Sequence, residues 1–155
     1  VDIPCRADAV VTSCGGFPKD ISLYQGTKTI DNVESALKPG GTLVLMIEAP
    51  EGGGPAEYFD WAKDLVAGTI ERRLREHFTV AGYIFFLNCE QAQRYNILLY
   101  SSIDPKAVEP MGIRAFSDVE ALLEAARLPG KTVYVIPNGA TVIPHIVKEA
   151  SANEA

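Results

Sequence analysis

The stretch that decides the fold is DAVVTSCGGFPKDISLYQGTK, which runs from Asp8 to Lys28. Its first part, Asp8–Ser13, is mainly apolar and is followed by Gly15–Gly16, as expected for a buried strand that ends in a tight turn. From Leu23 to Leu37 the apolar residues recur at helical spacing, and Pro39–Gly41 ends that pattern. The stretch therefore predicts a strand, a glycine turn and a helix, which together open an α/β fold.

The same alternation of apolar runs and helical patterns continues along the chain. Short strands that are apolar on both faces and separated by helices are typical of a parallel sheet covered on both sides. We therefore predict a Rossmann-like, three-layer α/β domain with a mainly parallel sheet of about four to six strands. Further strands are expected at Thr42–Ile47, Asn96–Ser101 and Thr132–Ile136, and helices at Pro55–Ala67, Thr69–Phe78 and Asp118–Arg127, while Val80–Gln93 begins like a strand and ends like a helix.

Composition excludes several classes of partner. The 155 residues fit one domain, and the net charge of −6 argues against nucleic acid and against an anionic membrane surface. No apolar run reaches the ~18 residues that a membrane span needs. The three cysteines, Cys5, Cys14 and Cys89, match neither a disulfide framework nor a metal-binding pair, which favours a reducing compartment. We therefore expect a cytoplasmic protein.

The ends of the chain suggest how it is organised. Because the sequence starts at Val1 and not at Met, we expect residues 1–7 to be a linker from an N-terminal domain. Residues 8–150 would then form the folded domain, and residues 151–155 a frayed tail.

Familiar catalytic motifs are missing. Neither a dinucleotide-binding GxGxxG nor a phosphate-binding GxxxxGK[ST] occurs. His77 is expected on a charged, solvated helix and His145 in a buried, hydrogen-bonded position, and neither has a partner at a metal-binding interval. A nucleophilic pair of Cys14 and His145 at one edge of the sheet is the alternative, but no orienting residue is identifiable, which favours a small, buried Cys14.

The helix after the glycine turn has two different faces. At roughly 100° per residue, its apolar stripe is formed by Leu23, Ile30, Val33 and Leu37. The opposite face carries Tyr24, Gln25 and Lys28 in the first two turns. Free N–H groups at the helix N-terminus, together with Lys28, would suit an anion such as a carboxylate. Gly26 costs about 1 kcal/mol relative to Ala, which indicates that another surface or a ligand comes close there.

Structural explanations for the same residues stay open at this point. Ser22 and Gln25 have the spacing of a capping box, which would make Gln25 structural. Lys28 could pair with Asp31 or Asn32 on a solvated face, and Tyr24 could be an ordinary boundary aromatic.

The segment from Ser13 to Lys28 resembles the start of the C-terminal domain of the nickel-dependent lactate racemase family. The family pattern runs approximately S-x-G-G-[YF]-P-x-D-x-x-x-Y-Q-x-x-K, and most of the chain is similar to the family. Here the matching residues are Ser13, Gly15, Gly16, Phe17, Pro18, Asp20, Tyr24, Gln25 and Lys28, with further similarity in KPGGTLVLMIEAPEG (Lys38–Gly52) and PNGATVIP (Pro137–Pro144).

The resemblance implies a two-domain enzyme that uses a nickel pincer nucleotide to move a hydride at the α-carbon of a 2-hydroxy acid. In that family the N-terminal domain carries the catalytic and metal-binding residues, so none is expected in this chain, which would be inactive alone. The C-terminal domain closes the cleft and binds substrate. Carried over, Gln25 and Lys28 would bind the small 2-hydroxy acid, and Tyr24, Ser13, Gly15 and Gly16 would lie on the cofactor side.

One departure leaves the substrate open. Some family members place a tryptophan in the region of Leu87–Gln91, but here that segment is LNCEQ and the only tryptophan is Trp61. Two alternatives therefore remain. The chain could be a non-catalytic small-carboxylate-binding module of the same fold, or an unrelated doubly wound domain that binds a nucleotide.

Overall fold

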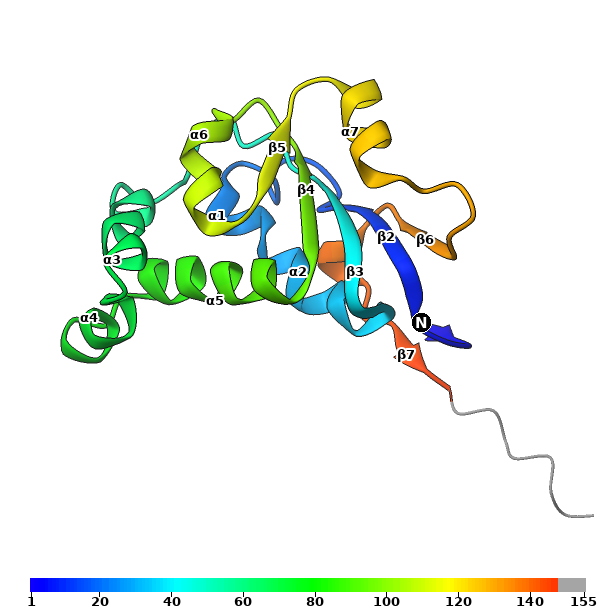
Figure 1. Cartoon of the computed structure of the whole chain (residues 1–155), viewed down its shortest axis with the longest axis horizontal. Coiled ribbons are helices and arrows are strands. Elements are labelled where there is room, and N and C mark those ends of the chain that lie inside the picture. The colour runs from blue at the N-terminus through cyan, green and yellow to red at the C-terminus, as the bar shows by residue number, and fades with distance from the viewer. Residues whose placement is uncertain (148–155) are drawn as a thin grey trace, which may run out of the picture.

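A computed structural model describes residues 1–147, so the predicted frayed tail lies outside the described residues. Its main sheet is wholly parallel, with five strands in the order β5-β4-β3-β2-β6. This arrangement confirms the predicted parallel α/β fold (Figure 1). The strands are β2 (Ala7–Ser13), β3 (Leu37–Met46), β4 (Asn96–Tyr100), β5 (Arg114–Phe116) and β6 (Val133–Ile136).

Helices cover both faces of the sheet. The helices that form the candidate site and its support are α1 (Leu23–Gly26), α2 (Lys28–Val33) and α5 (Val80–Arg94), and the opposite face is covered by α7 (Val119–Ala126) (Figure 1). No helix within residues 1–147 is long and apolar enough to cross a membrane. The remaining helical segments are η1 (Glu34–Ala36), η2 (Tyr58–Trp61), α3 (Ala62–Val66), α4 (Ile70–Glu76), α6 (Pro105–Val108), η3 (Glu109–Met111) and η4 (Gly139–Thr141).

The two faces bury cores of different size. Successive strand residues point to opposite faces, so Leu43 and Leu45 join the core under α1, α2 and α5, whereas Val44 joins the core under α7. The first core includes large buried side chains such as Phe85 and Trp61. Most of the buried apolar surface that stabilises the domain therefore lies on the side that carries the candidate site.

The long helix predicted over Leu23–Leu37 is interrupted. Thr27 separates α1 from α2, and its hydroxyl donates to the carbonyl oxygen of Leu23 at 2.8 Å, a back-bond that competes with regular helix geometry. Leu37 is not helical but begins β3, where it pairs with Ala7 before an irregularity in the register. The expected apolar stripe is nevertheless buried, with Leu23, Ile30, Val33 and Leu37 at most 1% exposed.

Other boundaries differ from the sequence prediction. The helix expected from Pro55 begins only at Tyr58, while α4 begins one residue after its cap, Thr69. Val80–Gln93 is helical throughout, because the Thr79 hydroxyl accepts from the Gly82 amide at 3.0 Å and caps α5. The edge strand β5 has only three residues and was not expected.

Residues 1–7 pack on the domain. β1 (Asp2–Ile3) pairs in parallel with β7 (His145–Ile146), and the Tyr134 hydroxyl donates to the carbonyl oxygen of Cys5 at 2.9 Å. The expectation that this segment leads from an N-terminal domain stays a prediction.

Candidate functional site

The loops that follow β2 and β6 are held together at the carboxyl end of the sheet. The Ser13 hydroxyl donates to the carbonyl oxygen of Pro137 at 2.6 Å and accepts from the Gly15 amide at 3.1 Å. Gly15 has a φ of +93°, and a Cβ there would lie 2.6 Å from Oδ1 of Asn138. Ser13 and Gly15 therefore fix the turn against the neighbouring loop, and only glycine fits the second position.

The start of α1 is not a free anion-binding terminus, so that part of the sequence interpretation is wrong. The amides of Leu23 and Tyr24 donate to the carbonyl oxygens of Gly52 and Gly53, at 2.9 and 3.1 Å. The amide of Gln25 points to the Ser22 hydroxyl, 3.4 Å away. The glycine-rich loop of residues 51–54 therefore satisfies the first N–H groups of the helix, and none is left for a ligand.

The side chains of Tyr24, Gln25 and Lys28 form one cluster, as their shared helical face predicts. Lys28 Nζ donates to Oε1 of Gln25 at 2.9 Å and lies 4.3 Å from the centre of the Tyr24 ring. The Gln25 side chain therefore does not complete a capping box. Within residues 1–147 Lys28 has no carboxylate within 4.0 Å, and its side-chain hydrogen bond is to Gln25, so the predicted alternative of pairing with Asp31 or Asn32 is also wrong.

The cluster borders a surface depression of about 500 Å³. Lys19 also lines the depression and comes from the loop after Gly16. In that loop the Lys19 amide donates to the Gly16 carbonyl oxygen at 2.9 Å. Two ammonium groups face a single carboxylate there, so the depression suits a small anion. Its lining comes from the loop after β2, from α1 and α2, from α5 and from η4, and consists of Lys19, Gln25, Lys28, Thr29, Asp31, Asn32, Ile84 and Ala140.

Gly26 is explained by close packing, as its cost in a helix indicated. A Cβ at this position would lie 2.6 Å from the side chain of Ile47, which is 1% exposed. The approaching surface is therefore the core residue after β3, and Gly26 allows α1 to sit directly against it.

A series of buried hydrogen bonds lies between α5 and the helices that carry Tyr24, Gln25 and Lys28. The Tyr58 hydroxyl donates to Oδ1 of Asn88 at 2.9 Å, Nδ2 of Asn88 donates to Oε1 of Gln91 at 3.0 Å, and Nε2 of Gln91 donates to Oδ1 of Asp31 at 2.7 Å. The Tyr58 ring also meets the Tyr24 ring edge-on, with centroids 6.3 Å apart. Burial raises the pKa of the Tyr58 phenol well above its usual value, so the phenol stays protonated and can donate to Asn88.

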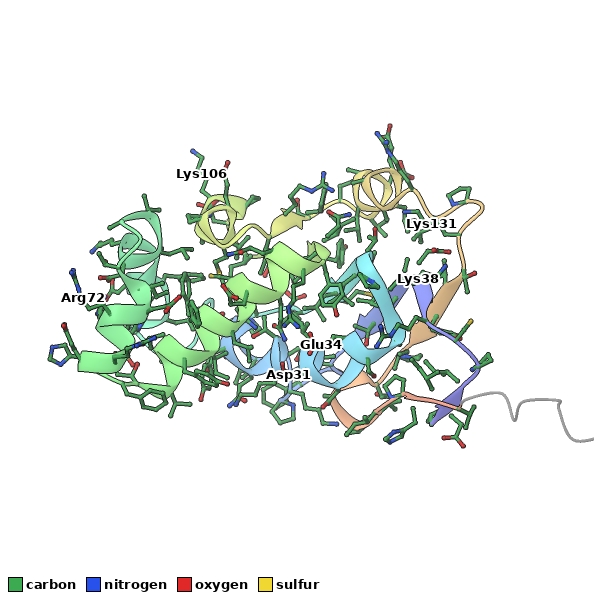
Figure 2. The ribbon with its side chains drawn as sticks, turned by 60° about the horizontal axis from the view of Figure 1, so that its bottom comes forward. Asp31, Glu34, Lys38, Arg72, Lys106 and Lys131 are labelled. Atoms are coloured by element: carbon green, nitrogen blue, oxygen red, sulfur yellow. The ribbon has the colours of Figure 1, made fainter. Side chains whose placement is uncertain are left out.

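Sequence reasoning missed these residues. Asn88 and Gln91 are three positions apart, which places them on one face of α5, and Figure 2 shows Asp31 where α2 passes that helix. Two amides on a face that also buries Phe85 are an unusual combination for a core helix. That signal was present in the sequence, but it could not name Asp31 as the partner.

The structure rules out the alternative pair of Cys14 and His145. Cys14 follows the carboxyl end of β2, whereas His145 lies in β7 beside the chain start, at the other end of that strand (Figure 1). Cys14 is fully buried, which raises the pKa of its thiol, so the simpler reading of Cys14 as a core residue is confirmed. The expected burial of His145 is wrong, because both residues of β7 are exposed, whereas His77 is exposed as predicted.

No group of three or more His, Cys, Asp or Glu side chains that could hold a metal ion occurs among residues 1–147. The groups that mark the candidate site are its lysine ammonium groups and the Gln25 amide.

Comparison with known proteins gives three findings. A family model described as the lactate racemase C-terminal domain matches residues 3–144. The lactate racemase of Thermoanaerobacterium thermosaccharolyticum is 38% identical over 58 residues, which are 37% of this chain and 14% of that protein. The structure of the lactate racemase apoprotein from the same organism matches with a TM-score of 0.79 and 24% identity, over 94% of this chain and 37% of that chain.

The solved structure and the family model support different statements. At 24% identity the solved structure supports the fold alone, whereas the family model covers most of this chain and shows the family. The matched part spans little more than a third of the solved relative and less of the curated sequence.

Proposed function

This chain belongs to the lactate racemase C-terminal domain family, and we propose that it is the substrate-binding, cleft-closing part of a nickel-pincer-nucleotide-dependent racemase or epimerase. Its substrate would be a small 2-hydroxy acid, and its partner would be an N-terminal domain of the same enzyme. The greater length of both relatives supports such a partner. Three free cysteines support a reducing, cytoplasmic location.

The observation that carries the proposal is the state of Lys28. Its ammonium group is held by Gln25 and by the Tyr24 ring but has no carboxylate within 4.0 Å among the described residues. Gln25 uses Oε1 to hold Lys28, while its Nε2 donates to nothing within residues 1–147. An ammonium and an amide N–H are thus both available at one rim, and a substrate carboxylate would accept charge-assisted hydrogen bonds from them.

The residues present fit the edge of the implied cofactor but not its metal. Gly16 has a φ of +78°, and a Cβ there would meet nothing within 4 Å, so a ligand can approach the backbone at this point. By the family resemblance we assign Ser13, Gly15, Gly16 and Tyr24 to the cofactor side, and the open space at Gly16 supports that assignment. When bound, the nickel pincer nucleotide would supply the hydride acceptor. Residues 1–147 contain no group of three or more His, Cys, Asp or Glu side chains that could hold a metal ion, and no step at the metal is assigned to this chain.

The mechanism assigned to these residues is positioning. Lys28 and Gln25 would hold the carboxylate and thereby fix the direction of the α-carbon hydrogen, which lowers the entropic part of the barrier. Closure of the depression against the partner domain would exclude water and strengthen the same contacts. The chain alone would then bind substrate weakly and turn none over.

Racemisation of a panel of 2-hydroxy acids, followed by chiral chromatography, tests the proposal. The two-domain enzyme loaded with its cofactor should racemise at least one member of the panel, and this chain alone should racemise none. Nickel-dependent turnover by the chain alone would show that the division of labour is wrong. Absence of turnover by the loaded two-domain enzyme across lactate, longer aliphatic and dicarboxylic 2-hydroxy acids would contradict the proposed activity.

A second candidate is a non-catalytic module that binds a small carboxylate. It is favoured by one observation, that Gln25 and Lys28 lie on adjoining helices of this chain, so the anchor needs no second domain. Titration of the chain with lactate and with acetate, followed by the Gln25 side-chain amide signals in NMR spectra, separates the two. Equal affinity for both ligands without a partner domain supports the module, and a marked preference for the 2-hydroxy acid supports the enzyme.

A further inference from the structure

Three polar side chains are buried on the side of the sheet that carries the largest apolar core. Tyr58 and Gln91 are fully buried and Asn88 is 2% exposed, yet each makes a hydrogen bond of 2.7–3.0 Å. The three hydrogen bonds all run in the same direction, with Tyr58 donating to Asn88, Asn88 to Gln91, and Gln91 to Asp31. We call these three residues the amide relay. A fully connected polar network inside a core fixes one arrangement of the elements that it joins.

Both ends of the amide relay reach the helices of the candidate site. At one end the Tyr58 ring packs edge-on against Tyr24, which in turn lies under Lys28 at 4.3 Å. At the other end Gln91 donates to Asp31, one helical turn beyond Lys28. The amide relay therefore contacts a neighbour of Lys28 at each end, Tyr24 through Tyr58 and Asp31 through Gln91.

The same face of α5 also contributes to the depression itself. Ile84, Asn88 and Gln91 follow each other at helical spacing on one face, and Ile84 lines the hollow beside Gln25 and Lys28. A shift of α5 relative to α2 would therefore change both the wall of the depression and the place of its cation.

We infer that Gln91, with Asn88 and Tyr58 behind it, is a positioning residue that fixes Lys28 and Gln25 for the substrate carboxylate. It does so by holding Asp31, and with it α2, against α5. Gln91 touches no substrate in this arrangement. The inference rests on the proposed function, because it gives the purpose of a fixed Lys28, but the position of Lys28 can be measured without any substrate.

NMR spectroscopy of the chain provides that measurement. The Lys28 ammonium lies over the Tyr24 ring, so the ring current should shift the Lys28 CεH₂ protons upfield of their random-coil value. In Gln91→Met, which keeps the length of the side chain but removes both its donor to Asp31 and its acceptor for Asn88, this upfield shift should be largely lost. A Gln91→Met chain that folds and keeps the full shift would overturn the inference.

Two matched comparisons separate positioning from general loss of stability. Leu122→Ala removes a fully buried side chain from the core under α7, on the opposite face of the sheet, and should leave the Lys28 shift unchanged. Asp31→Asn keeps an oxygen that can accept from Gln91 and should retain the shift, whereas Asp31→Ala should lose it. Asp31 is exposed, so this second pair decides the matter even where Gln91→Met does not fold. Equal shifts in Asp31→Asn and Asp31→Ala would contradict the inference.

Kinetics of the two-domain enzyme then separate this inference from the proposed function. Asp31→Ala should raise KM about tenfold with a smaller change in kcat, and it should add little in a Lys28→Ala background, because both changes remove the same contact. The Asp31→Ala chain could lose the Lys28 shift while the unmodified two-domain enzyme turns over no 2-hydroxy acid. That result would support the positioning role and reject the proposed function. Turnover that depends on Lys28 but is unchanged in Asp31→Ala would reject the positioning role alone.

Discussion

Two hollows lie at opposite ends of the parallel sheet, and both are basic. The one at the carboxyl end, of about 500 Å³, holds Lys19 and Lys28, and the one at the amino end, of about 600 Å³, holds Arg114, Arg127 and Lys131. The second is bordered by the first residues of β4 and β5 and by the end of α7. Figure 2 shows Lys131 well separated from Asp31, which belongs to the first.

The cations of the two hollows are held in different ways. At the amino end Lys131 Nζ donates to the carbonyl oxygen of Ala126 at 3.1 Å, and Arg114 donates to Oδ1 of Asn96, also at 3.1 Å. Lys131 therefore completes the C-terminus of α7, where a cation is favoured by the helix dipole. Lys28 instead leans on Gln25 and Tyr24, and a buried network supports its helix.

The volume and charge of a hollow therefore do not identify a functional site. Two of the amino-end cations have a structural use, Lys131 at a helix end and Arg114 at the start of an edge strand. The carboxyl-end cations line a hollow bordered by the loops that follow parallel strands, where ligands bind in open α/β sheets. Four experiments test this contrast.

The largest expected effect comes from removing a cation at each end of the two-domain enzyme. Lys28→Ala should lower kcat/KM about tenfold to a hundredfold, because a charge-assisted hydrogen bond is worth roughly 1.5–3 kcal/mol. Lys28→Arg should not restore it, since a planar fork differs from a point charge. Arg127→Gly removes a cation from the amino-end hollow at a residue whose φ of +48° suits glycine, and steady-state kinetics should show no loss. An equal loss in both variants would remove the distinction.

A smaller effect is expected from filling the contact that seats α1. Gly26→Ala would place a Cβ within 2.6–2.9 Å of the Ile47 side chain, and overpacking of this kind costs about 1–3 kcal/mol of unfolding free energy. Chemical denaturation measures the loss. Adding Ile47→Val removes the Cδ1 atom that the new methyl group would meet, so the double variant should recover part of the stability. Additive losses would show that the close packing of Gly26 and Ile47 is not what the position requires.

Strong acid should loosen the amino end of the sheet at Asp8. Asp8 accepts from Lys38 at 2.7 Å and from the Thr132 amide at 2.9 Å. Both bonds lower the pKa of the Asp8 carboxyl below 3.8, and the bond from Lys38 has the larger effect. A depressed folded-state pKa means that the stabilisation is present above pH 3.8 and is lost as pH falls through the lower folded value. The NMR signal of the Thr132 amide proton should therefore shift below pH 3.8 as the Asp8 carboxyl is protonated. Asp8→Asn should remove that transition. The Tyr58–Asn88 hydrogen bond joins two groups that carry no charge in this range, so the Asn88 side-chain signals should not follow the Asp8 transition.

The smallest effect concerns the cysteines, one of which lies near each end. Cys5 is exposed beside the amino end, while Cys14 is buried at the carboxyl end and Cys89 is buried in α5. Burial raises the pKa of the Cys14 thiol and raises that of Cys89 to about 12, so neither forms the reactive thiolate at neutral pH. Iodoacetamide should label Cys5 alone in the folded chain, and mass spectrometry of peptides would locate the label. Cys5→Ser should change the unfolding free energy by less than about 0.5 kcal/mol. Rapid labelling of Cys14 in the folded chain would show that the carboxyl end opens.

The apolar runs of the sequence determined the strands β2, β3 and β4, because a buried parallel strand must be apolar on both faces. The apolar run Val133–Ile136 likewise indicated β6, although this edge strand is only partly buried. The helical spacing of Leu23, Ile30, Val33 and Leu37 likewise determined which face of the following helices would be buried, and so which face would carry Tyr24, Gln25 and Lys28. Both were read correctly although the helix itself was drawn too long, since the direction of a side chain survives a short interruption.

Only the tertiary structure decided what those site residues do with one another and with the rest of the chain. The carbonyl oxygens that occupy the α1 amides come from residues 52 and 53, and the partner of Gln91 is Asp31, 60 positions away. Three-residue β5 and two-residue β7 exist because neighbouring strands offer an edge, so their own sequences carry no period, and His145 was misplaced for that reason. Local spacing fixes the face on which a residue lies, but hydrogen-bond partners are chosen by whatever the fold brings within 3 Å, and that choice is not local.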